Sequence, residues 1–148
     1  MLKKNYRINK NFQEVKSAFS NMNGKLIQKM LPFGWGLDNY KGMRRRAILR
    51  IYVGSKLYKF KVAMFSSTSK RYYFHIINVD EGPYKLKFLS TRVAVEDKGN
   101  YTEIQETIEY TTKNKSFDRI LSLFINMHYA LRSAKYKLFF FINQKRSI

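Results

Sequence analysis

The chain has 148 residues and no cysteine, and its 29 Lys and Arg residues outnumber its 10 Asp and Glu residues, giving a net charge of +19. This length predicts a single domain over residues 1–148 with one hydrophobic core. The lack of cysteine excludes disulfides, thiolate nucleophiles and cysteine-based metal sites. Because His75 and His128 are its only histidines, we expect neither a metal nor another cofactor.

The basic residues are spread along the whole chain, and they form a run only at Arg44–Arg46. Such a charge attracts nucleic acid and anionic surfaces through nonspecific Coulomb forces. A composition biased toward Lys, Asn, Ile, Tyr and Phe also accounts for it, so we expect no nucleic-acid contact beyond nonspecific attraction. The N-terminal residues lack an apolar signal segment, and no run of about 18 apolar residues could span a membrane. These features favour a cytoplasmic location.

The N-terminal part of the chain predicts a strand, two short helices and a loop. Asn11 and Glu14 have the spacing of a capping box, which marks the start of the first helix. Pro32 and the glycines after it end the second. In order, we expect a strand at Lys4–Asn11, a helix from Asn11 to Ser20, a helix at Lys25–Leu31 and a loop at Pro32–Gly42.

From Arg44 onward, apolar and polar residues alternate with the two-residue period of strands. Gly54–Ser55 and Glu96–Asn100 are turns, and each joins two strands into a hairpin. The pattern predicts a meandering antiparallel sheet whose strands cover Arg44–Val53, Leu57–Met64, Arg71–Val79, Tyr84–Val95 and Tyr101–Tyr110.

The last of these strands has two faces that differ in polarity. By strand periodicity, one face carries Thr102, Ile104, Glu106, Ile108 and Tyr110. Glu106 is a carboxylate on this mostly apolar face, and burial of an ionised group is costly unless it has a partner or a ligand. Glu106 is therefore a candidate site residue, and an ion pair with a neighbouring Lys or Arg is the alternative.

The C-terminal region predicts one long helix. It begins with an N-cap at Ser116, ends near Phe141 and has about 25 residues. Apolar residues at steps of three and four form a stripe that we expect to pack on the concave face of the sheet: Phe117, Ile120, Phe124, Met127, Leu131, Ala134, Leu138 and Phe141.

This order of elements resembles the START-like or SRPBCC superfamily, whose helix-grip fold also occurs in pollen-allergen proteins and polyketide cyclases. Two segments sharpen the resemblance, Asp80-Glu-Gly-Pro-Tyr84 and the strand Tyr101–Tyr110. They resemble a bacterial ligand-binding subgroup in which Gly-Pro-aromatic precedes a strand with Trp and His, and a Thr-x-x-x-Asp-x-x-x-Tyr strand follows. On this alignment Glu106 takes the acidic position and Tyr110 the aromatic one.

The resemblance implies an α+β helix-grip fold, with a curved antiparallel sheet wrapped around a long C-terminal helix and two short helices after the first strand. It also implies a cavity between sheet and helix that holds a hydrophobic or amphipathic small molecule. The chain departs from the subgroup at Lys87, Leu89 and Thr91, which stand where that subgroup often has Trp and two His. Chemistry that relies on those histidines is therefore not expected here.

Candidate cavity residues follow from the inward faces of the predicted strands and helix. Glu106, His75 and His128 are the polar candidates. Each apolar candidate has a plain role in core packing as its alternative, and each histidine has a structural one. Trp35 is expected to cover the cavity mouth or to pack against the second helix. The candidate set is Phe60, Val62, Met64, Phe74, Leu89, Ile104, Glu106, Ile108, Phe124, Met127, His128 and Leu131.

Three classes of function stay open at this point. The first is binding of a hydrophobic small molecule. The second is a cyclase- or hydratase-type enzyme, which would need an acid–base pair in the cavity, such as Glu106 with His128 or a buried tyrosine. The third is a basic protein that binds nucleic acid or an anionic surface. The sequence assigns no catalytic residue, ligand identity or oligomeric state.

Overall fold

The computed structural model describes residues 2–32, 34–83, 86–112 and 115–146, and the side chains of 112–118 and 141–148 lie outside that description. Its strands form one curved antiparallel sheet in the order β1-β7-β6-β5-β4-β3-β2. The strands are β1 (Leu2–Ile8), β2 (Trp35–Asp38), β3 (Ile48–Val53), β4 (Lys56–Ser67), β5 (Arg71–Asn78), β6 (Leu86–Asp97) and β7 (Thr102–Thr112).

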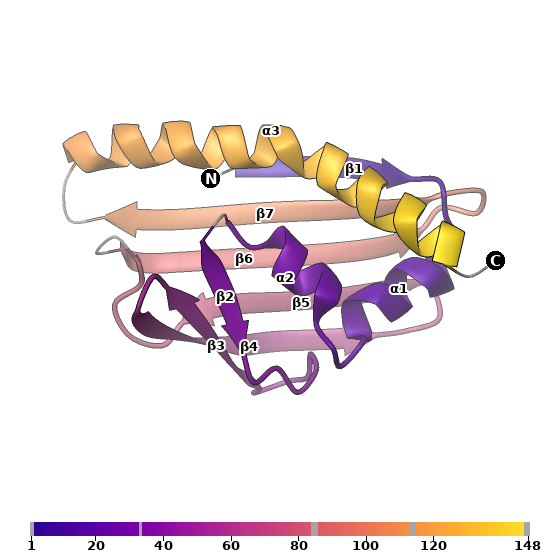
Figure 1. The fold of residues 1–148 in the computed structure, drawn as a ribbon, viewed down its shortest axis with the longest axis horizontal. Helices are drawn as coiled ribbons and strands as arrows, with labels where there is room; N and C mark the ends of the chain where they lie inside the picture. The colour runs from indigo at the N-terminus through magenta and orange to yellow at the C-terminus, as the bar shows by residue number, and fades with distance from the viewer. Residues whose placement is uncertain (1, 33, 84–85, 113–114, 147–148) are drawn as a thin grey trace.

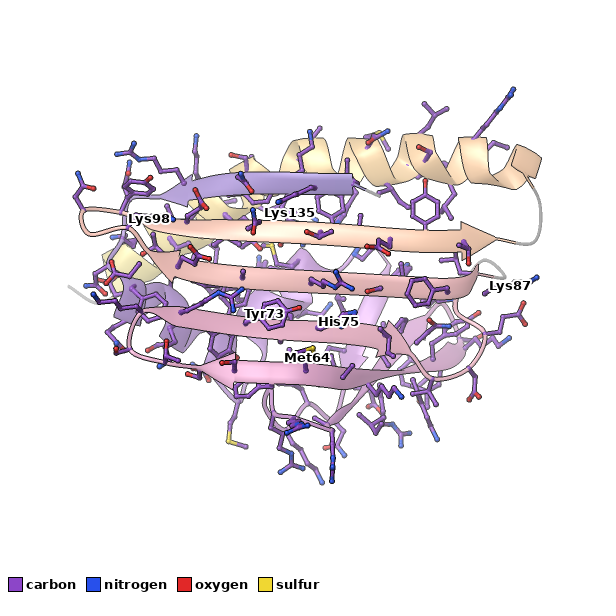
Figure 2. All side chains as sticks on the ribbon, turned by 180° about the vertical axis from the view of Figure 1, so that it is seen from behind. Met64, Tyr73, His75, Lys87, Lys98 and Lys135 are labelled. Atoms are coloured by element: carbon purple, nitrogen blue, oxygen red, sulfur yellow. The ribbon has the colours of Figure 1, made fainter. Side chains whose placement is uncertain are left out.

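Among the described residues, three helices accompany the sheet: α1 (Phe12–Ser20), α2 (Lys25–Met30) and α3 (Lys115–Arg146). Figure 1 shows α1 and α2 in front of the sheet and α3 along it, beside β7 and β1. Seen from behind, no helix of the described part of the chain covers the other face of the sheet (Figure 2). The fold is the helix-grip fold that the sequence predicts, and no helix among the described residues has the length and apolar content needed to cross a membrane.

Local interactions explain how the N-terminal helices are placed. The Asn11 side chain accepts a hydrogen bond of 2.9 Å from the Glu14 backbone N–H, which confirms the predicted N-cap of α1. Gly24 enters α2 with a φ of 65°, a left-handed conformation that favours glycine. A Cβ atom there would lie 2.8 Å from Cδ1 of Tyr40, so the close approach also requires glycine.

The segment predicted as a loop, Pro32–Gly42, contains a strand, β2, that the sequence does not predict. β2 pairs with β3 and forms one edge of the sheet. The Gln28 side chain of α2 holds it, because its amide donates to the Trp35 carbonyl at 2.9 Å and accepts from the Leu37 N–H at 2.7 Å. A tertiary contact from a helix therefore stabilises a strand that its own glycine-containing sequence does not predict.

The predicted polarity of β7 is correct. Thr102, Ile104, Glu106 and Ile108 are buried and alternate with partly exposed side chains. The strand lies between β1 and β6, so both of its backbone edges are paired. The boundaries of the first strand were predicted less well, because it covers Leu2–Ile8 rather than Lys4–Asn11.

Met64 was predicted to face inward, and this is wrong. The register between β4 and β5 shifts between Val62 and Met64, which is the signature of a β-bulge. One extra residue in a strand reverses the direction of every side chain after it. Met64 is consequently exposed, and it lies on the face without helices, near Tyr73 and His75 of the neighbouring strand (Figure 2).

The long helix is present, but its predicted buried face is wrong. α3 begins at Lys115, one residue before the predicted N-cap Ser116, and has 32 residues. Within 119–140 its buried side chains are Leu121, Tyr129, Arg132, Tyr136 and Phe140. The predicted stripe is exposed at Ile120, Phe124, Met127, Leu131 and Leu138. The side chains of Phe117 and Phe141 lie outside the described residues.

The hydrophobic core gathers aromatic rings from four elements. Phe19 of α1 packs against Tyr72 and Phe74 of β5 and against Tyr136 of α3, with ring centroids 6.0 to 6.3 Å apart. Tyr6 of β1 packs on the same Tyr136 ring at 5.2 Å. This cluster joins the C-terminal half of α3 to the sheet, beside the candidate site.

Candidate ligand-binding site

A cavity of about 840 Å³ lies between the sheet, α2 and α3. This volume is within the usual range of about 300–1,000 Å³ for small-molecule sites. Its walls are mostly apolar, and every strand from β2 to β7 contributes to them. Nine of the twelve predicted residues line it: Phe60, Phe74, Leu89, Glu106, Ile108, Phe124, Met127, His128 and Leu131.

The remaining three predicted residues do not line the cavity. Met64 points to the opposite face because of the bulge in β4. Val62 and Ile104 are fully buried within the hydrophobic core. Ile104 pairs with Tyr6 in the register of β1 and β7, and the Tyr6 ring packs on Tyr136. The C-terminal half of α3 therefore fills the space that Ile104 faces.

A buried polar cluster interrupts the apolar wall. Glu106 of β7 is 3% exposed and Arg132 of α3 is 6% exposed. Arg132 Nε lies 3.3 Å from Glu106 Oε2, and the Tyr136 hydroxyl donates a hydrogen bond to Glu106 Oε1. Arg132 also donates through Nη1 to the Met30 carbonyl of α2. The two alternatives considered for Glu106, a site residue and an ion-pair partner, are therefore compatible, because its carboxylate is ion-paired and also lines the cavity.

Hydrogen bonding in this cluster is incomplete. Among the described residues, neither Glu106 Oε2 nor Arg132 Nε has a hydrogen-bond partner, because the ion pair between them lacks hydrogen-bond geometry. His128 Nε2 is also buried without a hydrogen-bond partner there. Unsatisfied buried polar atoms are rare in folded proteins. Three such atoms belong to residues that line the cavity, so the polar part of its wall is not fully hydrogen-bonded among the described residues.

Burial governs the protonation of these groups. Desolvation raises the pKa of the Glu106 carboxyl, although Arg132 and Tyr136 oppose the shift. Desolvation and the Glu106 carboxylate raise the pKa of the Tyr136 hydroxyl well above its usual value. Desolvation, followed by the charges of Arg132 and Lys135, lowers the pKa of His128 to about 4. His128 is therefore neutral at pH 7, while Tyr136 keeps its proton.

Among the polar lining residues that were not predicted from the sequence, three are buried: Tyr129, Arg132 and Tyr136. They follow one another at steps of three and four on the buried face of α3. This face is less aliphatic than the predicted stripe, so hydrophobicity alone favours the wrong side of the helix. The usable signal is Glu106 itself, because a carboxylate on an apolar strand face requires a buried cation.

The other two sequence candidates have separate positions. Trp35 of β2 lines the cavity, as Leu31 and Pro32 do. His75 lies away from the cavity, and its Nε2 makes a hydrogen bond of 2.6 Å with the Ser90 hydroxyl. Among the described residues, no three acidic or histidine side chains come together in a way that could hold a metal ion.

A curved sheet that closes on a long C-terminal helix, with an apolar cavity between them, defines a helix-grip protein with an internal pocket. No family model matches the chain, and no curated protein matches it by sequence. Solved structures do match it in fold.

A protein from Arthrobacter aurescens superposes with a TM-score of 0.59 at 13% identity, over 89% of this chain and 79% of the other. DynU16, from the dynemicin biosynthetic locus, superposes with a TM-score of 0.58 at 16% identity, over 91% of this chain but 46% of its own. Ara h 8.0201 superposes with a TM-score of 0.52 at 12% identity, over 89% and 97%. At these identities the likeness shows the shared fold.

Proposed function

We propose that this protein binds a hydrophobic or amphipathic small molecule in the cavity between the sheet and α3. The observation that carries the proposal is the cavity itself, which has a volume of about 840 Å³ and an apolar wall interrupted by one polar cluster. Such a wall excludes water from an apolar ligand, and a few polar groups then fix its orientation. The fold is shared with DynU16 and Ara h 8.0201, which supports a pocket of this type.

The polar cluster suits a ligand with one polar end. Arg132, Tyr129 and neutral His128 carry hydrogen-bond donors, and all three line the cavity. The rest of the ligand would contact apolar side chains such as Phe60, Phe74 and Leu89. In this proposal residues 1–148 form one START-like domain of the bacterial ligand-binding subgroup.

A cyclase- or hydratase-type enzyme is the second candidate, and one observation favours it. Tyr136 and Glu106 form a hydrogen-bonded acid–base pair in the cavity wall, and burial raises the pKa of Glu106. Both oxygens of Glu106 already face protein groups, Tyr136 on one side and Arg132 on the other. In this arrangement Glu106 holds Arg132 in position and does not present a free oxygen as a base to a substrate. We therefore prefer ligand binding to catalysis as the function.

A ligand-binding experiment tests the proposal. A fluorescent fatty acid is titrated into the purified protein and into a Leu89→Trp variant, which fills part of the cavity. Saturable binding at one site is expected, with affinity at least about tenfold weaker in the variant. Met64→Trp is the control, because Met64 lies on the other face of the sheet and should leave the affinity unchanged. Equal affinity in all three proteins would show that the cavity does not bind the probe.

Native mass spectrometry then separates binding from catalysis. A small molecule that copurifies with the protein is extracted, identified and returned to the ligand-free protein. Recovery of the unchanged molecule supports binding. Conversion to a new mass that Glu106→Gln stops supports the enzyme instead.

A further inference from the structure

α3 carries an apolar face that no other part of the described chain covers. Ile120, Leu123, Phe124, Met127 and Leu131, here called the α3 stripe, are each more than half exposed. Their spacing of one, three and four residues places them on a single helix face. Leu123 is the most exposed at 72%. Contiguous exposed apolar surface of this kind marks an interaction site.

The charged residues of α3 are mostly basic. Its sequence contains seven Lys and Arg residues and one acidic residue, Asp118, although Arg132 is buried in its ion pair with Glu106. Arg119 and Lys137 are exposed and lie eighteen residues apart. Because eighteen residues make five turns of an α-helix, both side chains lie along the same edge of α3. α3 is therefore a cationic amphipathic helix whose apolar side faces solvent, a pattern typical of helices that lie on lipid surfaces.

The net charge of +19 decides between the possible partners. A second copy of the chain would bring an equal positive charge to the apolar contact, and the two would repel. An anionic lipid surface offers both an apolar layer for the stripe and negative headgroups for the lysines and arginines. We propose that this protein docks on anionic lipid bilayers through the α3 stripe.

The stripe also borders the cavity. Ile120, Phe124, Met127 and Leu131 are exposed and line the cavity at the same time, so they form its mouth. Docking through them sets that mouth against the lipid. If the proposed ligand-binding function also holds, an apolar ligand passes between bilayer and cavity without crossing water. Leu123 belongs to the stripe but does not line the cavity, so docking can be tested separately from ligand binding.

The test measures cosedimentation with vesicles of phosphatidylcholine containing about one third phosphatidylglycerol, at about 0.1 M salt. Three variants each add one negative charge: Leu123→Glu, Met127→Glu and Met64→Glu. Met127 and Met64 are both 57% exposed, so this pair is matched in residue type and exposure but lies on different faces of the protein. We expect Leu123→Glu and Met127→Glu to weaken vesicle binding at least about tenfold, and Met64→Glu to weaken it less than about threefold.

Several results would overturn the docking proposal. Equal weakening by all three variants would show that the vesicles sense overall charge and not the stripe. Failure of the unaltered protein to bind these vesicles would remove the proposal outright. A dimer in light scattering that Leu123→Glu dissociates would assign the stripe to a second copy. Tight binding to double-stranded DNA, combined with no vesicle binding, would favour nucleic acid. Weak fatty-acid binding with intact vesicle binding would refute the cavity function alone.

Discussion

The Tyr136 hydroxyl donates a hydrogen bond to Glu106, and this contact joins α3 to β7 across 30 residues of sequence. Arg132 Nε lies 3.3 Å from the other carboxylate oxygen, and Arg132 Nη1 donates a hydrogen bond to the Met30 carbonyl of α2. One buried carboxylate thus links the sheet to two helices around the cavity. Its removal should affect stability more than any surface ion pair of the protein.

The first prediction concerns Glu106→Gln. This change leaves the buried Arg132 guanidinium without its countercharge, and loss of one partner of a buried pair typically costs about 3–5 kcal/mol. We expect a loss of about 3 kcal/mol in the free energy of unfolding, measured by urea denaturation. Glu103→Gln on the same strand is the control. Because Glu103 faces outward, its replacement should cost less than about 1 kcal/mol.

Arg132→Met in the Glu106→Gln background sharpens this prediction. The double variant removes both charges, so we expect it to be more stable than Glu106→Gln alone. A double variant whose loss equals the sum of the two single losses would mean that the two residues do not interact.

The second prediction compares two tyrosines whose rings are in contact. Tyr136→Phe removes the donor to Glu106 and should lower the free energy of unfolding by about 1–3 kcal/mol. The Tyr6 hydroxyl is buried without a hydrogen-bond partner among the described residues, so Tyr6→Phe should be neutral or stabilising. Urea denaturation of both variants measures the difference. Equal losses would contradict the assigned hydrogen bond.

The sequence predicts the order of elements well because alternation and capping are local. The N-cap at Asn11 and the two faces of β7 depend on residues within a few positions of each other, and both are correct. β2 and the bulge before Met64 depend on contacts with other elements, namely Gln28 of α2 and the register of β5. No local pattern contains that information.

The candidate site was predicted in part for the same reason. Glu106 can be identified from the sequence because it is a carboxylate on an otherwise apolar strand face. Its partners lie on a face of α3 that is less hydrophobic than the predicted stripe, so the sequence pattern does not identify them. The aliphatic stripe through Phe124 and Met127 looks like a core face, whereas the structure exposes it. Arg132 and Tyr136 lie inward because Glu106 requires a cation and a donor.

The third prediction tests the backbone at the start of α2. Gly24→Ala places a Cβ atom at a φ of 65°, 2.8 Å from Tyr40 Cδ1 and 2.9 Å from Leu37 Cδ2. Strain and steric clash together should cost about 1–3 kcal/mol in unfolding free energy. Gly36→Ala is the matched control, since beyond its two chain neighbours no residue has a heavy atom within 4 Å of a Cβ there. Thermal unfolding of both variants separates the two cases, and an unchanged Tm for Gly24→Ala would contradict the close contact.

The last prediction concerns His128 and pH. Its pKa is lowered from 6.5 to about 4 in the folded protein, first by desolvation and then by the charges of Arg132 and Lys135. Below pH 6.5 the unfolded chain therefore takes up a proton at this residue that the folded protein does not. The contribution of His128 to the free energy of unfolding is therefore fully present above pH 6.5, and it is lost as the pH falls toward 4.

Glu106 contributes with the opposite sign, because its pKa is raised and the folded protein takes up that proton first. A comparison of variants isolates the histidine from this effect. We expect the Tm of the unaltered protein to fall more steeply between pH 6.5 and pH 4 than that of His128→Gln, which cannot titrate in this window. Parallel Tm curves for the two proteins would show that His128 is protonated as readily in the folded state as in the unfolded chain. Steeper loss in the unaltered protein would place a neutral imidazole in the cavity wall at physiological pH.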